Sequence, residues 1–402
     1  MKSRPTLILH IGPMKTGTTS LQFALHRSRK LLASHGIRYL ADYLHGNSNT
    51  AALGLIGPDG LTQGEWHYWD RREDDWKRLR QQLLDPKTQL TVVSGEAFAE
   101  CDDHAISRLR AELSAYDVHL VLTLRRLSAL VPSVWQESAK RRPYPSLSEF
   151  SDRLLSREVG DEISNRFWRC QEHDMLIRRW QLNLQPTKTT IIIPDKSEPN
   201  LLLSAFATVM GIPKDAASEL VNAAKFYKNR SRTAEEMALR QKLFKQLQES
   251  GLMDSARIYS QRMVHSGEDR VPLLDEHDIS LDNSARKEWL PIEKRMVSAL
   301  RDLKVQSIGD IGSLVSPSVS LDEVDGQSRL SVDGLLDASS HLVSQMLLGA
   351  GVRQNGESDL SWLAKHTRLS HLWSLVLINT FWFVVPRRVH PYVRRFIWRI
   401  RQ

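Results

Sequence analysis

The chain has 402 residues, of which 41% are apolar and 25% charged, with 20 glycines and 16 prolines. This composition excludes a collagen-like, fully disordered or mainly low-complexity protein. The length allows one large domain with appendages, or two domains. Two cysteines, Cys101 and Cys170, are too few for a disulfide framework, so we expect buried thiols in a reducing compartment.

The formal net charge is +8, but it is concentrated at the end of the chain. Residues 386–402 contain six arginines and no acidic residue, and subtracting them leaves a net charge of +2 for the remainder. A body so close to neutral argues against nucleic-acid binding.

The first residues combine a basic pair with a short apolar run, Leu7–Ile11, that leads directly into a Gly/Thr loop. The run is only about a third of a bilayer span, and no small-residue cleavage site follows it. We therefore expect a buried first strand in place of a signal peptide, and a cytoplasmic location for the part of the chain that follows.

Up to about residue 250, short apolar runs rich in β-branched residues alternate with amphipathic segments. This alternation predicts an α/β fold of three layers, in which a central parallel sheet is flanked by helices. The predicted strands are Leu7–Ile11, Ile37–Leu40, Leu90–Ser94, Val118–Leu124 and Thr189–Ile193. The clearest predicted helices are Thr18–Ser34, Trp76–Leu84, Ala105–Ser114, Ser128–Lys140 and Arg166–Leu182.

Beyond this region the pattern changes twice. It is helical from about Thr233 to Leu303, and we expect the domain to extend over 1–304. Residues 305–360 are richer in Ser, Gly, Asp and Val, which predicts a linker or a loosely structured segment. Residues 361–402 form an aromatic, basic C-terminal tail that we expect to be a helical extension.

The most informative segment is His10–Ser20, HIGPMKTGTTS, which follows the first strand and opens the first helix. A Gly-rich turn between strand and helix directs backbone N–H groups and the positive helix end to one point, which suits a phosphate or sulfate. Gly12 and Gly17 have the spacing of a Walker A loop. However, Thr18 stands where the Walker A lysine is expected, and the lysine is instead Lys15, inside the loop.

This displacement has a chemical consequence. A lysine at the helix start serves the β- and γ-phosphates of a nucleotide together with Mg²⁺, whereas Lys15 would reach over the terminal group and its bridging oxygen. Neither candidate strand ends in the Asp of a Walker B motif: one is followed by Glu96, the other by a basic pair, Arg125 and Arg126. Because two cations beside the phosphates oppose a metal ion, we expect no metal in the site.

The segment Pro13–Thr19 resembles the 5′-phosphosulfate loop of sulfotransferases that use 3′-phosphoadenosine 5′-phosphosulfate (PAPS), whose core reads Pro-Lys-[Ser/Thr]-Gly-Thr-[Ser/Thr]. Met14 is an additional residue between Pro and Lys. The resemblance implies that PAPS is the co-substrate. It also implies that the donor is held by Pro13, Lys15, Thr16, Gly17, Thr18 and Thr19.

A second motif supports the resemblance. In this family an Arg at a strand end and a Ser eight residues later, on the next helix, bind the 3′-phosphate of the donor. Arg125 and Ser133 have this spacing, and they offer a planar guanidinium fork and a neutral hydroxyl donor. The resemblance covers about residues 5–250 and includes Met175–Trp180, which follows the pattern of bacterial and carbohydrate-type members.

By this resemblance the reaction is an in-line transfer of the sulfuryl group to a hydroxyl acceptor, a carbohydrate or a glycolipid. Lys15 is the predicted cation for the leaving phosphate oxygen. Glu96 is the predicted base, because it follows a strand at the edge where parallel sheets place their chemistry and resembles the glutamate base of carbohydrate sulfotransferases. Glu100 and His45 are alternative bases.

Aromatic residues between the second and third predicted strands are candidates for a glycan cleft, or for packing onto the core. They are Trp66, Tyr68, Trp69 and Trp76. Basic residues that could attract an anionic acceptor, or simply form a solvated surface, are Arg71, Arg72, Lys140, Arg141 and Arg142.

The tail combines tryptophan and arginine. Its tryptophans are Trp362, Trp373, Trp382 and Trp398. Its apolar run, Leu372–Val385, spans 14 residues, fewer than a transmembrane helix needs. This composition suits the headgroup layer of an anionic membrane and predicts peripheral attachment to the inner face of a membrane, with packing on the body or in a dimer as the alternative.

Two other functions stay open. One is a nucleoside or sugar kinase of the P-loop type, and the other is a non-catalytic nucleotide-binding protein that the tail tethers to a membrane.

Overall fold

The computed structural model describes residues 4–41, 46–57, 69–85, 87–140, 142–194, 198, 200–224, 231–249, 271–274, 276–317, 331, 333–335, 337–339 and 341. The chain divides into two compact units. The first comprises residues 1–134, 147–227 and 281–323, and the second comprises residues 135–146, 228–280 and 324–402.

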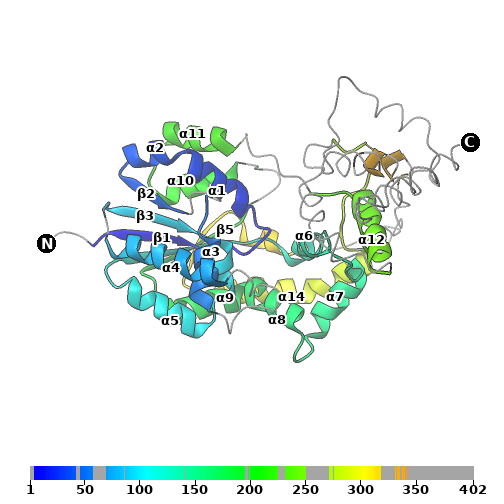
Figure 1. Cartoon of the computed structure of the whole chain (residues 1–402). Helices are drawn as coiled ribbons and strands as arrows, with labels where there is room; N and C mark the ends of the chain where they lie inside the picture. Colours follow the sequence, from blue (N-terminus) through cyan, green and yellow to red (C-terminus); the bar gives the residue numbers. More distant parts are fainter. Residues whose placement is uncertain are drawn as a thin grey trace, which may run out of the picture. The chain divides into compact units, whose positions relative to one another are not determined.

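The first unit is built around a parallel sheet of six strands (Figure 1). The strands are β1 Thr6–His10, β2 Ile37–Leu40, β3 Leu90–Ser94, β4 Asp117–Thr123, β5 Lys188–Ile192 and β6 Gln306–Ile308. Their order across the sheet is β2-β3-β1-β4-β5-β6, so that β1 lies between β3 and β4. The prediction of a three-layer α/β fold with a parallel sheet is confirmed.

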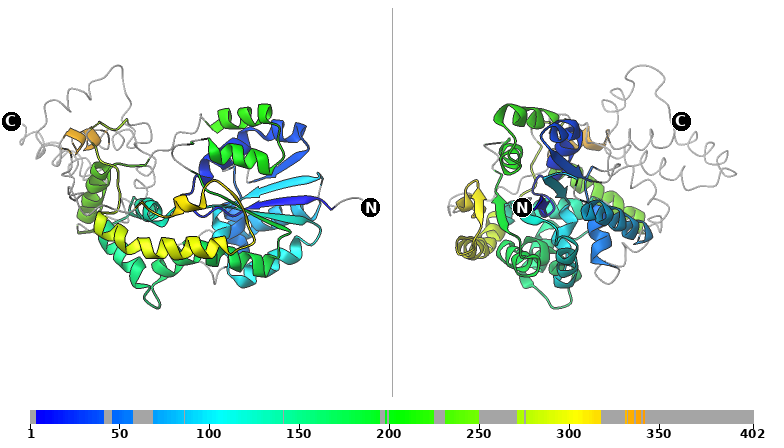
Figure 2. Two further views of the ribbon diagram at one scale, coloured as in Figure 1. Left: turned by 180° about the vertical axis from the view of Figure 1, so that it is seen from behind. Right: turned by 90° about the vertical axis from the view of Figure 1, so that its left-hand side faces the viewer.

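Helices cover both faces of this sheet (Figures 1 and 2). One face carries α1 Thr18–Arg27, α2 Arg29–Ser34, α10 Leu201–Val209 and α11 Lys214–Ala224. The other carries α3 Asn49–Ile56, α4 Trp69–Leu84, α5 Asp103–Glu112, α9 His173–Leu184 and part of α14 Asn283–Arg301. The remaining elements of this unit are the 3-10 helices η3 Glu96–Glu100 and η4 Ile311–Leu314, the helices α7 Leu147–Ser156 and α8 Glu162–Gln171, and most of α6 Leu127–Ala139.

The two cores are made by alternate residues of the same strands. Leu7 and Leu9 of β1 enter one core, and Ile8 enters the other. Side chains of a strand alternate between its faces, so a strand covered on both sides must be apolar at consecutive positions. This is why the predicted strands read as continuous apolar runs. All five agree with the structure to within one residue at each end.

The predicted helices and the predicted linker differ from the structure in four places. The helix expected over Arg166–Leu182 is interrupted at Glu172 and forms parts of α8 and α9. The helix expected over Thr18–Ser34 is interrupted at Ser28 and forms α1 and α2. The helix expected to begin at Trp76 begins at Trp69, and α3 precedes it. The linker expected over 305–360 opens with β6, which pairs with β5, and with η4, whose Leu314 is buried in the core.

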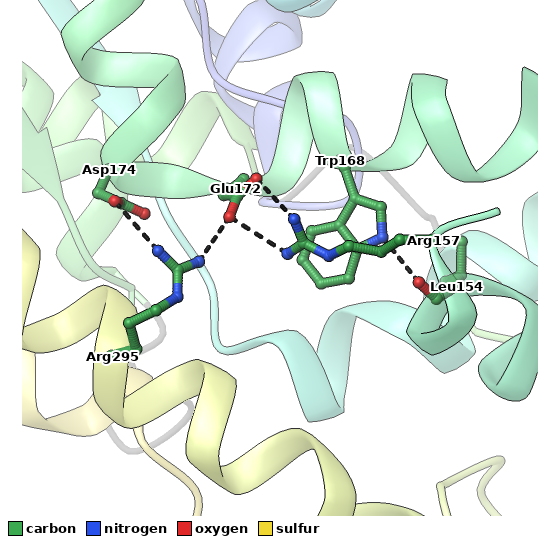
Figure 3. A network of polar contacts seen from close by, with 6 residues as sticks. All are labelled: Leu154, Arg157, Trp168, Glu172, Asp174 and Arg295. Carbon is green, nitrogen blue, oxygen red and sulfur yellow. Dashed lines mark hydrogen bonds and ion pairs between the residues drawn. The ribbon is translucent and has the colours of Figure 1, made fainter. Parts of the chain in front are cut away.

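A polar network joins α14 to α7, α8 and α9 (Figure 3). The carboxylate of Glu172, at the junction of α8 and α9, accepts hydrogen bonds from Arg157 at 3.2 Å and from Arg295 of α14 at 2.5 Å. Arg295 also reaches Asp174 at 3.5 Å. The Arg157 guanidinium lies 3.7 Å from the centre of the Trp168 ring, whose indole N–H donates to a backbone carbonyl of α7. Residues more than 120 positions apart are thereby held together.

The second unit contains α12, Ala234–Glu249. Thr233 and Glu236 form a capping box at its start: Glu236 N–H donates to the Thr233 hydroxyl at 3.2 Å, and Thr233 N–H donates to the Glu236 carboxylate at 3.1 Å. The buried Glu235 lies 2.8 Å from Nδ1 of His277. The capping box satisfies two backbone N–H groups at the start of α12, and the Glu235 contact ties the helix to residue 277.

Several predicted features lie outside the described residues. They are His45, Trp66, Tyr68, Arg141 and the tail over 361–402. Within the described part of the chain, no helix is both long enough and apolar enough to cross a membrane. The two cysteines are free buried thiols, as expected.

Because two histidines are buried, we expect the folded protein to be less stable at mildly acidic pH. Burial lowers the pKa of His10 and of His173 from 6.5 to about 3. The unfolded chain takes up these protons below about pH 6.5, and the folded chain does not. The free energy of unfolding should therefore fall as the pH drops from 6.5 to 4.5, by up to about 1.4 kcal/mol per pH unit for each histidine. Urea unfolding across this range measures the slope of the free energy of unfolding against pH. His173→Asn should reduce this slope by the contribution of one proton, about 1.4 kcal/mol per pH unit. An equal slope in wild type and variant would contradict this account.

The Glu172 network predicts a modest contribution to stability. Both arginines are partly exposed, and such pairs contribute about 0.2–1 kcal/mol each. Glu172→Gln should lower the free energy of unfolding by about 0.5–2 kcal/mol, and 1 M salt should shrink the difference. The exposed Glu158→Gln is the matched control and should change stability little. Identical urea midpoints for the two variants would refute the prediction.

Candidate active site at the carboxyl edge of the sheet

The segments singled out by the sequence meet at the carboxyl ends of three neighbouring strands. His10, the last residue of β1, is in register with Ser94 at the end of β3 and with Val121 of β4. The chain leaves β1 towards β2 on one side of the sheet and leaves β4 towards β5 on the other. This reversal of direction is where open parallel sheets form a crevice for ligands.

The predicted phosphate loop connects β1 to α1 in a tightly curled conformation. Lys15 has a φ of 70° and Gly17, the N-cap of α1, a φ of 93°, so two left-handed residues are separated by one. The buried hydroxyl of Thr16 donates to the Pro13 carbonyl at 2.7 Å and closes the turn. Left-handed residues in such a loop turn successive N–H groups towards one side, as in anion-binding nests. A lysine in this conformation is strained by about 1–2 kcal/mol, as is typical of functional loops.

Glu96 lies against the start of α1. The Thr18 hydroxyl, on the first residue of α1, donates to Oε2 of Glu96 at 2.6 Å. The turn that carries Glu96 is held at both ends. The Gly95 N–H donates to the His10 carbonyl at 3.1 Å, and the Ala97 N–H donates to the side chain of Asn49 in α3 at 3.2 Å. The structure therefore brings the predicted base and the predicted phosphate loop together.

Arg125 reaches the same loop from β4. Its Nη1 donates to the carbonyl of Lys15 at 3.3 Å. Burial and the neighbouring Arg126 lower the pKa of Arg125, but an arginine remains charged at any physiological pH. Two residues after Arg125 the chain enters α6, which carries the half-buried Ser133 in its second turn. The structure thus places a guanidinium beside the loop backbone.

The start of α6 is fixed by a residue that the sequence did not single out. Glu293 of α14 is 1% exposed, and its carboxylate accepts from the N–H groups of Ser128 and Ser316 at 2.8 and 2.7 Å. A carboxylate at a helix N-terminus satisfies free N–H groups and interacts favourably with the helix dipole. With 165 positions between Glu293 and Ser128, no local sequence signal connects them.

Other described candidates for the base and the acceptor cleft have contacts away from the loop. Glu100 forms an ion pair with Arg166 of α8 at 2.7 Å. Trp76 packs, partly buried, against the core on the α4 side of the sheet. In the second unit, Lys140 pairs with Glu137. These observations favour Glu96 over Glu100 at the loop and assign Trp76 to packing.

A further polar group beneath the loop was also missed. It consists of His10, Ser94, Thr123 and Gln22, which are all buried. The available signal was a polar residue at the carboxyl end of each of three largely apolar strands. Another missed contact comes from Gln171 of α8, whose side chain donates to the carbonyl of Met14 at 3.4 Å. It supports the loop at the residue that is additional to the resembling motif.

No protein-family model matches this chain, and a search of curated proteins finds no relative. Among the described residues, no group of three or more His, Cys, Asp or Glu side chains is placed to hold a metal ion.

Gly12 has no room for a side chain, which gives a prediction about the loop. A Cβ added there would lie 2.6 Å from Nε2 of His10 and 2.9 Å from the Thr18 methyl group. Because both neighbours are buried, Gly12→Ala should lower the free energy of unfolding by about 1–3 kcal/mol in urea titrations. Gly36→Ala is the matched control: its φ is +70° but its surroundings are open, so it should cost only about 1 kcal/mol. A Gly12→Ala protein as stable as wild type would contradict the packing described here.

Proposed function

We propose that this chain is a PAPS-dependent sulfotransferase that moves a sulfuryl group to a hydroxyl acceptor, without a metal. The contact that carries the proposal is the 2.6 Å hydrogen bond between Thr18 and Glu96. It fixes a carboxylate beside the helix end and the lysine-bearing loop. A group-transfer enzyme needs this arrangement of a base next to an anion-binding loop.

On the donor side, the loop from Pro13 to Thr19 would hold the 5′-phosphosulfate through backbone N–H and hydroxyl groups. Lys15 would neutralise the bridging oxygen, and Arg125 with Ser133 would bind the 3′-phosphate. The contact between Arg125 and the Lys15 carbonyl supports this assignment, because it places the guanidinium next to the loop. A planar guanidinium fork matches the oxygens of a phosphate.

In the proposed reaction, the acceptor oxygen attacks sulfur in line with the leaving oxygen. A new S–O bond forms to the acceptor while the S–O bond to the 5′-phosphate of the donor breaks. The acceptor proton passes to the carboxylate of Glu96, and the electron pair of the broken bond stays on the phosphate oxygen beside Lys15. Adenosine 3′,5′-bisphosphate is the second product.

The hydrogen bond from Thr18 gives Glu96 a defined orientation. In a kinase of the P-loop type, the first residue of this helix would be a lysine directed at the phosphates. Here Thr18 occupies that position and is engaged with Glu96, which favours sulfuryl transfer over the kinase reaction.

The donor site predicts which nucleotide stabilises the protein. Adenosine 3′,5′-bisphosphate at about 100 times its Kd should add roughly 2.7 kcal/mol to the free energy of unfolding, with or without Mg²⁺. Thermal unfolding in the presence of the bisphosphate, of ATP and of Mg²⁺-ATP measures this. Arg125→Ala should abolish the effect of the bisphosphate. Stabilisation by Mg²⁺-ATP alone would favour the kinase alternative.

Glu96→Gln distinguishes catalysis from binding. The amide keeps the shape of the side chain but cannot take a proton, so the variant should bind adenosine 3′,5′-bisphosphate like wild type. Its release of this product from PAPS, with a panel of mono- and oligosaccharide acceptors, should fall about 10²–10⁴-fold. Glu100→Gln is the control and should keep its activity. Equal activity of Glu96→Gln and wild type would remove Glu96 from the mechanism.

For the acceptor we propose a carbohydrate or a glycolipid. The enzyme would act in the cytoplasm, with the tail over 361–402 attached to the inner face of a membrane. Binding of the full-length chain to anionic vesicles, compared with neutral vesicles, tests this attachment.

A further inference from the structure

A chain of buried hydrogen bonds runs across the sheet directly beneath the candidate site. Nδ1 of His10 lies 2.8 Å from the Ser94 hydroxyl, and Nε2 lies 2.8 Å from the Thr123 hydroxyl. The side-chain amide of Gln22, on α1, donates to the same Ser94 oxygen at 3.2 Å. His10, Ser94 and Thr123 are completely buried, and Gln22 is 3% exposed.

These hydrogen bonds link three neighbouring strands of the sheet. His10, Ser94 and Thr123 lie near the carboxyl ends of β1, β3 and β4, which are neighbours in the sheet. All three share the face that carries α1 and α10, as their alternate neighbours in each strand show. The imidazole of His10 therefore bridges the central strand to both of its neighbours.

Each of these strand ends leads into a different part of the candidate site. The phosphate loop follows His10, Glu96 follows Ser94 by two residues, and Arg125 follows Thr123 by two residues. The helix α1 is tied to the β3 end twice, by Thr18 to Glu96 and by Gln22 to Ser94, one turn apart. The side chain of His10 therefore contacts, or directly precedes, the strand end that leads into each of the three parts.

The loop also packs directly on the His10 ring. Gly12, two residues on, leaves no space for a Cβ next to Nε2. The ring also meets Phe206 of α10 edge to face, with centroids 5.2 Å apart. The ring therefore serves both as a surface for the loop and as a hydrogen-bonding bridge.

The ring is neutral, because complete burial lowers the pKa of His10 to about 3. A neutral imidazole donates through one nitrogen and accepts through the other, and a hydroxyl can serve either. Both tautomers are therefore compatible with the same pair of hydroxyl partners. An apolar ring would leave both hydroxyls without this partner in a dry site, which is costly.

We propose that His10 is a positioning residue that holds the phosphate loop, Glu96 and Arg125 in their mutual arrangement: Nδ1 acts on the Glu96 side through Ser94, and Nε2 acts on the Arg125 side through Thr123. The assignment of Glu96 and Arg125 rests on the proposed function, whereas the bridge between the strand ends does not depend on it.

Three variants separate the two sides of the ring. Asn places an amide near the position of Nδ1 and Gln places one near Nε2, so His10→Asn keeps a partner for Ser94 and His10→Gln keeps one for Thr123. His10→Phe keeps the ring and its contact with Phe206 but loses both hydrogen bonds. Two readouts apply: hydrogen exchange of peptides 11–20, 94–101 and 123–130, and the Kd for adenosine 3′,5′-bisphosphate.

The expected results differ between the variants. His10→Gln should speed exchange in 94–101 about tenfold and leave the Kd within about threefold of wild type. His10→Asn should speed exchange in 123–130 and raise the Kd about tenfold. His10→Phe should speed exchange in all three peptides and raise the Kd.

The matched control is His119→Phe. His119 is another buried histidine and lies in β4. Its Nε2 lies 2.8 Å from the Thr190 hydroxyl of β5, far from the carboxyl ends of the strands. This variant should lose stability without changing the Kd or the exchange of the three peptides. It shows the effect of removing a buried histidine bond as such.

The result that would overturn the proposal is exchange that, for both His10→Asn and His10→Gln, equals wild type or rises by the same factor in all three peptides. The Asn and Gln pair decides the question even where His10→Phe does not fold. If wild type binds no adenosine 3′,5′-bisphosphate, the proposed function fails, and the exchange data alone decide the role of His10.

Discussion

The pairing of β1 with β3 on one side and with β4 on the other determines the candidate site. In a parallel sheet all carboxyl ends lie at one edge. Strand pairing therefore brings residues 10, 94 and 123 together although they are far apart in the sequence. Polar side chains on a doubly covered sheet need partners in the same layer. Here His10 is the partner of both Ser94 and Thr123. The distances between the three strand ends set the distances between the loops that follow them.

Two groups that favour negative charge meet at the lysine-bearing loop. The N-terminus of α1, where Thr18 donates to Glu96, follows the loop directly, and the Arg125 guanidinium donates to the loop backbone. At the start of α6, the carboxylate of Glu293 lies at another helix N-terminus and accepts from two backbone N–H groups. Both carboxylates accept a hydrogen bond at the start of a helix, but of the two only Glu96 contacts the phosphate loop.

Much of this arrangement could be predicted from residues that are close in sequence. The apolar strands, the strand-loop-helix unit around Lys15 and the placement of Glu96 at a strand end all follow from local patterns and from the rule that parallel strands end together. The contribution of α14 could not be predicted, because Glu293 and Arg295 act on partners more than 120 residues away. The strand β6 has three residues and no periodicity, so its composition resembles that of a linker.

The interleaving of the two units along the chain has a consequence for the order of folding during synthesis. When the ribosome has made the first 227 residues, five strands of the sheet are available but β5 still has an unpaired edge, and α6 lacks the carboxylate of Glu293 at its start. The missing pieces emerge only after residues 228–280 of the second unit, a delay of several seconds at roughly 5–20 residues per second. During that interval the nascent chain exposes a strand edge of the kind that recruits other strands. Completion of the first unit is therefore tied to translation of a segment that belongs to the second unit.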